Sequence, residues 1–97
     1  MITVYWRDIP SQVMGRKGRE TTCKVQLSQR FQEAIDRAAM RAGKGSSTAY
    51  IEEWRRESLE CAGDLESAVQ AEVERLEAAF GDDLLERMVK AGGVSVG

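Results

Sequence analysis

The sequence predicts an α+β fold, in which an antiparallel sheet of three to four strands is covered by helices on one face. Two observations indicate this class: apolar residues alternate with period two in the first third of the chain, and helical stripes follow it. The expected element order is β-β-β-α-β-α-α. We expect residues 1–91 to form a single domain and residues 92–97 to form a flexible C-terminal tail.

The first predicted strand begins at the N-terminus. Ile2, Val4 and Trp6 alternate with more polar neighbours, which is the period of a half-buried strand. Pro10 ends this strand, because proline has no N–H to continue the ladder.

The next two strands are predicted to form a hairpin. A short run at residues 12–14 precedes Gly15-Arg16-Lys17-Gly18, where glycines at the tip supply the positive φ angles that tight turns need. The third strand has the cleanest alternation in the sequence. Its apolar or small set is Thr21, Cys23, Val25 and Leu27.

A first helix is expected after Ser28, which suits the N-cap position. Gly43 stands where a glycine commonly ends a helix. The apolar face between them consists of Phe31, Ile35, Ala38, Ala39 and Ala42.

A long helix is expected after Asp64, a good N-cap residue, and Gly81 ends it. A short last helix then starts at Asp82 or Asp83. The apolar stripe of the long helix is Leu65, Val69, Val73, Leu76 and Phe80, and its opposite face carries Glu66, Gln70, Glu74 and Glu77.

Residues 49–59 fit either a strand or a helix. As a helix they give only a weak stripe, of Ile51, Trp54, Ser58 and Leu59. As a strand they have no cleanly apolar face, which suits an edge position, and charges there discourage edge-to-edge pairing. We therefore favour an edge strand.

Charge divides the chain into two halves. Residues 1–44 carry nine Lys or Arg and four Asp or Glu, whereas residues 45–97 carry five and twelve. The net charge of −2 conceals a basic first half and an acidic second half. Such a distribution suits contact with charged partners.

The composition excludes several kinds of chemistry. The chain has no histidine and two cysteines, which removes Ser-His and Cys-His nucleophiles and leaves too few ligands for most zinc sites. No apolar run approaches the length of a membrane span, and the N-terminus has no signal-peptide pattern. We expect a cytoplasmic protein without a cofactor or metal, and not an enzyme.

Three segments stand out: ITVYWRDIP at residues 2–10, RFQEAIDRAAMRAG at residues 30–43 and AYIEEWRR at residues 49–56. Together they resemble a small bacterial family labelled only "virulence factor". The label names no biochemical activity, and no residue carries over as catalytic. The resemblance implies, through a loose association with folate- and corrinoid-dependent methyl-transfer enzymes, an accessory role beside such enzymes.

Two Trp-Arg steps are the main candidates for binding a partner. Strands that pair would bring Trp6-Arg7 and Trp54-Arg55-Arg56 together as an amphipathic docking surface, within cation–π range. Trp and Arg also dominate interface hot spots. Trp6 shares a face with apolar residues, so we expect it in the core, whereas for Trp54 core and surface are equally balanced.

The hairpin tip is a second candidate. Arg16, Lys17 and Arg19 with their flanking glycines suit a phosphate, although the tip has no aromatic residues on which nucleic-acid bases would stack. A solvated turn is the simpler interpretation.

Cys61, close to the cap of the long helix, is a third candidate, as a reactive thiol. A small half-buried residue is again the simpler interpretation.

These patterns favour a small, non-catalytic accessory protein that binds another cytoplasmic protein. A phosphate- or nucleic-acid-binding module that uses the basic hairpin is the first alternative, and a thiol-dependent enzyme that uses Cys61 is the second.

Overall fold

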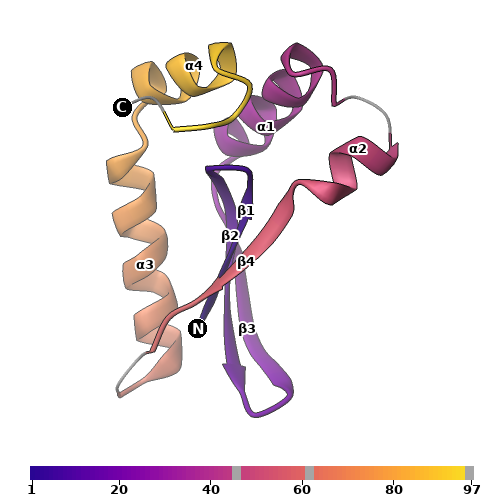
Figure 1. Cartoon of the computed structure of the whole chain (residues 1–97). Coiled ribbons are helices and arrows are strands. Elements are labelled where there is room, and N and C mark those ends of the chain that lie inside the picture. Colours follow the sequence, from indigo (N-terminus) through magenta and orange to yellow (C-terminus); the bar gives the residue numbers. More distant parts are fainter. Residues whose placement is uncertain (45–46, 61–62, 96–97) are drawn as a thin grey trace.

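The computed structural model describes residues 1–44, 47–60 and 63–95, apart from the side chain of Ser47. It confirms the α+β class: one antiparallel sheet has the strand order β3-β2-β1-β4, and helices pack around it (Figure 1). None of the helices among these residues is long and apolar enough to cross a membrane. The strands are β1 (Ile2–Trp6), β2 (Ile9–Lys17), β3 (Glu20–Gln26) and β4 (Trp54–Ser58), and the helices are α1 (Gln29–Arg41), α2 (Ser47–Glu52), α3 (Leu65–Ala79) and α4 (Asp82–Lys90).

The helices surround the sheet unevenly. The long helix α3 packs against β2 and β3, while α1 and α4 pack against each other across the end of the sheet that carries the β1–β2 turn (Figure 1). The short helix α2 leads into β4 at the opposite side of the molecule from α3.

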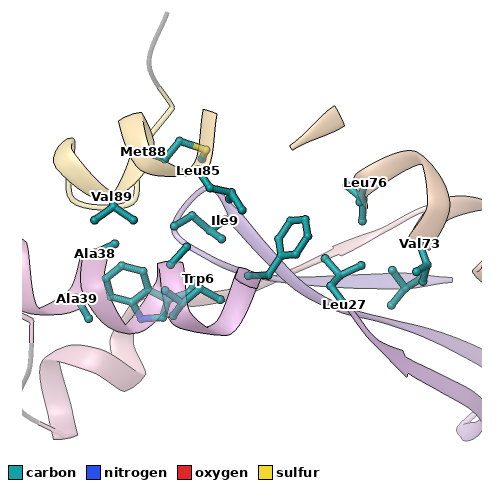
Figure 2. Packing of buried hydrophobic residues seen from close by; sticks show 14 of the residues in the cluster. Trp6, Ile9, Leu27, Ala38, Ala39, Val73, Leu76, Leu85, Met88 and Val89 are labelled. Atoms are coloured by element: carbon teal, nitrogen blue, oxygen red, sulfur yellow. The ribbon is translucent and has the colours of Figure 1, made fainter. Parts of the chain in front are cut away.

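The core lies where the helices meet the sheet. Trp6 and Ile9 come from the β1–β2 turn, and both are fully buried. Figure 2 shows the indole of Trp6 beside Ala38 and Ala39, whose small side chains let α1 approach it closely. The other labelled core residues are Leu27, Val73, Leu76, Leu85, Met88 and Val89.

Helices α1 and α3 begin where the sequence predicts. Only one of their two N-cap residues makes the expected capping hydrogen bond. Asp64 caps α3 as expected, because its carboxylate accepts a hydrogen bond from the Ser67 N–H at 3.3 Å. Ser28 occupies the N-cap of α1 but makes no side-chain cap bond. Its hydroxyl instead donates to Glu77 at 2.8 Å, so Ser28 fixes α1 to the end of α3.

The prediction of an edge strand over residues 49–59 is wrong in its first half. Ser47–Glu52 is the helix α2, and the strand occupies only Trp54–Ser58. The helical turn places Tyr50 over Trp6, with ring centroids 5.7 Å apart, and lets the Tyr50 carbonyl accept from the Trp6 indole N–H at 2.9 Å. This tertiary contact outweighs the weak local pattern.

Gly15 lies inside β2, next to a β-bulge, rather than in the hairpin turn. An added Cβ there would lie 2.6 Å from the Cys23 sulfur and 2.8 Å from Leu65 Cγ. The glycine therefore lets α3 approach the sheet. The turn itself is Gly18-Arg19, and Gly18 has the positive φ of 64°.

The residues that follow α4 are hydrogen-bonded as far as Ser95, although the sequence suggests a frayed end there. Gly92 and Gly93 are buried, and the Gly93 carbonyl accepts from the Asp8 N–H at 2.9 Å. Gly93 also lies against the Trp6 ring, where a Cβ would come within 2.8 Å. Residues 96–97 of the expected tail lie outside the described residues.

Gly15→Val tests the close approach of α3. Valine favours strands, so local propensity alone would stabilise the protein, whereas crowding against Cys23 and Leu65 should destabilise it by about 1–3 kcal/mol. Urea unfolding measures the difference. Gly81→Ser is the matched control, because Gly81 is an N-cap with open space around it and should tolerate serine without loss. A Gly15→Val variant as stable as the native chain would contradict the packing described.

Candidate interaction surface

The two Trp-Arg steps lie side by side, as the sequence predicts. β1 and β4 pair antiparallel without a bulge, and the register sets Trp6 opposite Trp54 and Tyr5 opposite Arg55. Trp6 is 0% exposed, so it offers no surface to a partner. Trp54 is half-buried and meets Tyr50 edge to face at 5.7 Å.

Arg7 is bound internally. It has a φ of 52°, the left-handed region that residues other than glycine seldom adopt. Its guanidinium donates to the Gly92 carbonyl at 3.0 Å, pairs with Glu53 at 3.4 Å and lies 5.6 Å from the Trp6 ring centroid. These contacts hold the strained turn, and they join it to both α2–β4 and the segment after α4.

Arg55 and Asp8 complete the same corner. Arg55 donates to the Arg7 carbonyl and to Asp8 Oδ1, the latter at 3.1 Å, and its guanidinium lies 4.8 Å over the Tyr5 ring. The other carboxylate oxygen of Asp8 accepts from the Ser95 N–H at 2.6 Å. Burial raises the pKa of Asp8, but the hydrogen bonds from Ser95 and Arg55 outweigh it and leave the pKa below its ordinary value.

We call Trp6, Arg7 and Asp8 the Trp-Arg-Asp turn. Sequence reasoning singled out its first two residues but missed the groups that hold it, namely the Tyr50 carbonyl and the Gly92–Ser95 backbone. The sequence feature that could have indicated this contact is the doublet Gly92-Gly93. Two adjacent glycines, with φ of 78° and 96°, allow the chain to pack closely against Trp6 and Arg7.

The accessible part of this region is the outer edge of β4. The Arg7 N–H donates to the Glu53 carbonyl at 3.0 Å, and the Leu59 N–H donates to the Met1 carbonyl at 2.7 Å. Backbone groups alternate in an antiparallel ladder, so odd-numbered residues of β4 bond to β1. The N–H and C=O groups of Trp54, Arg56 and Ser58 therefore point outward, and the described residues place no strand beyond them.

The opposite edge of the sheet, β3, is less regular. A bulge interrupts its pairing with β2, where Gly15 pairs with Cys23 but Arg16 pairs with Thr21. Bulges twist an edge and hinder the addition of a further strand. β4 is thus the edge better suited to an added strand.

The basic hairpin remains exposed at the far end of the sheet. Lys17 and Arg19 are exposed, and Arg16 donates to the Arg19 carbonyl at 3.3 Å. Arg16 and Lys17 line an open cavity of about 670 Å³ together with Asp64 and Glu66. An anion in this cavity would meet two carboxylates as well as two cations.

Part of the charge division is satisfied within the molecule. Five ion pairs among the described residues join a cation of residues 1–44 to a carboxylate of residues 45–97: Arg7–Glu53, Arg30–Glu77, Arg30–Asp82, Arg37–Glu86 and Lys44–Glu53. A sixth pair, Arg55–Asp8, joins the two halves with the opposite assignment of charge. Burial raises the pKa of Glu77, but hydrogen bonds from Ser28 and Arg30 outweigh this effect and lower it. The opposite charges of the two halves thus join α1 to α3 and α4.

The cysteines give little support for thiol or metal chemistry in the described part of the chain. Cys23 is a free, half-buried thiol that packs against the core beside Gly15. Cys61 lies outside the described residues. Among the residues that are described, no three cysteine or acidic side chains gather as metal ligands.

A sequence profile of the family described as "Virulence factor" matches residues 4–89. The chain belongs to the virulence factor family. Neither the curated proteins nor the solved structures contain a match to it. The region shared with the virulence factor family includes the Trp-Arg-Asp turn and all of β4, and it ends within α4.

Substitutions of Arg7 test the internal role of the Trp-Arg-Asp turn. Arg7→Ala loses the charged hydrogen bonds to Gly92 and Glu53, which should cost about 1.5–3 kcal/mol. Arg7→Gly loses the same bonds but relieves the left-handed backbone, so we expect it to be more stable than Arg7→Ala by about 1 kcal/mol. Thermal and urea unfolding measure both. If Arg7→Ala is the more stable variant, the turn does not store this strain.

Proposed function

We propose that this protein is a small, non-catalytic accessory protein that binds an extended segment of another cytoplasmic protein along the outer edge of β4. The segment adds a fifth strand to the sheet, next to β4. Main-chain hydrogen bonds then supply affinity, and alternate side chains supply specificity.

The observation that carries the proposal is the unpaired, bulge-free edge of β4. Its five residues keep a continuous register with β1, and four of them are exposed. An open edge of this kind attracts other strands unless the protein blocks it. Arg55 and Asp8, which would otherwise present free charges beside β4, are paired with each other.

Side chains next to the edge suit a mixed apolar and polar segment. Trp54 is half-buried at one end of β4, and Leu59, 43% exposed, follows the other end. Arg56 is exposed between them and forms no ion pair among the described residues. A segment with apolar residues at its ends and an acidic residue at its centre would match this order.

The family association makes folate- and corrinoid-dependent methyl-transfer enzymes the first partners to test. Binding of phosphate or nucleic acid by the hairpin is the second candidate function, supported by the exposure of Lys17 and Arg19. It ranks lower because Asp64 and Glu66 line the hairpin cavity. Its affinity would fall steeply with salt.

Arg56→Pro tests the proposal directly. Proline removes the outward N–H of residue 56 but no hydrogen bond to β1, so the fold should persist while partner binding weakens at least about tenfold. The tagged protein is purified from a native lysate, the co-purifying protein is identified, and its affinity for each variant is measured by calorimetry.

Arg56→Ala is the matched control, because it removes the same side chain and keeps the N–H. We expect it to retain most of the binding. Equal binding by Arg56→Pro and the native chain, with both folded, would show that the edge of β4 is not used. If partner binding is lost only after Lys17→Glu and Arg19→Glu, the result would support binding by the basic hairpin instead.

A further inference from the structure

Helices α1 and α4 pack side by side and form a surface separate from β4 (Figure 1). Arg30 pairs with Asp82 at the start of both helices, and Arg37 pairs with Glu86 further along, at 3.0 Å. The two C-terminal ends therefore lie at the same end of the pair. Arg41 is in the last turn of α1, and Lys90 is in the last turn of α4.

A groove runs between these helices. Its inner hollow, of about 170 Å³, has an apolar floor that includes Ala34, Leu85 and Val89, and the two ion pairs lie along its sides. Its outer hollow, of about 410 Å³, is open and is lined by Arg37, Met40, Arg41 and Val89. Arg37 and Val89 line both hollows, so the two hollows adjoin.

Met40 is the apolar feature of the outer hollow. It is 74% exposed, the largest fraction among the exposed large hydrophobic residues of the described chain. A single exposed apolar residue is ordinary on a protein surface. Here, however, the methionine stands beside Val89 in a hollow, and its flexible side chain can adapt to an inserted group.

Positive charge surrounds that hollow, and no carboxylate lines it. Arg37, Lys90 and Arg41 all act on Glu86 and lower its pKa, with the hydrogen bond from Arg37 as the largest cause. Three cations thus act on Glu86, and Glu33 acts with it on Arg37. Arg41 and Lys90 form no ion pair among the described residues, so their charges remain available to a ligand.

We propose that the outer end of the α1–α4 groove binds an acidic protein segment, which inserts one apolar side chain between Met40 and Val89. Carboxylates of that segment pair with Arg41 and Lys90. Complementary charge favours this occupant, and the exposed methionine supplies the apolar contact that a bare phosphate could not use.

A second copy of this chain suits the groove less well. Some of the acidic side chains that form no ion pair among the described residues, such as Glu66 and Glu74, lie on α3, which is a different surface, whereas Glu33 and Asp36 lie on α1 itself. Contact between two different surfaces is head-to-tail and does not close a dimer. The groove is also distinct from β4, so the protein would hold two partners, or two parts of one partner, on separate surfaces.

The probe is a short fluorescein-labelled peptide of repeating Glu-Glu-Leu units, titrated into the isotope-labelled protein while NMR spectra are recorded. We expect shifts of the backbone amides in residues 37–41 and 88–91, and affinity that falls with salt. Arg41→Glu and Met40→Ala should each weaken binding about tenfold or more. A Gln-Gln-Leu peptide should not bind.

Lys24→Glu is the matched control, since it makes the same charge change at an exposed residue of β3. If Lys24→Glu and Arg41→Glu weaken peptide binding equally, the effect comes from the net charge of the protein and not from the groove. That result would overturn the proposal. Amide shifts confined to β4 or the hairpin, or no binding at all, would also overturn it.

Self-association is measured separately by sedimentation. Self-association that depends on Met40 would show that a second copy of the chain, and not an acidic segment of another protein, occupies the groove. None of these outcomes bears on the Arg56→Pro result, so this groove and the edge of β4 are tested independently.

Discussion

Burial of Trp6 is the constraint on which the rest of the structure depends. Its indole packs against α1, its N–H donates to the Tyr50 carbonyl, and Gly93 covers its ring. Three segments far apart in the sequence thus meet at one side chain. The next two residues reinforce the junction, because Arg7 bonds Glu53 and Gly92, and Asp8 bonds Arg55 and Ser95. The groups of the Trp-Arg-Asp turn are therefore bonded within the protein. The outer edge of β4 is the part of this region that a partner can reach.

Charge has a similar internal role. The basic and acidic halves of the chain fold against each other, and Arg30 illustrates this: it pairs with Glu77 and Asp82 and donates to the carbonyls of Glu77 and Phe80. Partly exposed pairs of this kind contribute modestly to stability, but together they fix how α1 meets α3 and α4. The cations that form no ion pair among the described residues include those of the hairpin, Arg56 on β4, and Arg41 and Lys90 at the outer end of the α1–α4 groove.

Much of the fold can be predicted from the sequence, because its strong patterns are local. Alternation around Val4 predicts β1, and the capping residue Asp64 with a regular apolar stripe predicts α3. The adjacency of the two Trp-Arg steps is also predictable. Residues 49–52 are different: their weak stripe does not decide between helix and strand, and the contact of Tyr50 with Trp6, 44 residues away in sequence, settles the outcome. The contacts of Gly92 and Gly93 are likewise long-range, and glycines carry no apolar pattern that would reveal them. Which Arg residues stay free for a partner depends on ion pairs that only the folded chain creates.

In the structure described here, β4 bonds to β1 on one side and is open on the other. Amide hydrogen exchange of the isolated protein, followed residue by residue by NMR, tests it most directly. We expect slow exchange at Arg55, Glu57 and Leu59, whose N–H groups face β1, and fast exchange at Arg56 and Ser58, whose N–H groups face outward. Protection of Arg56 and Ser58 equal to that of their neighbours would show that the outer edge is already covered and that β4 is not open to a further strand.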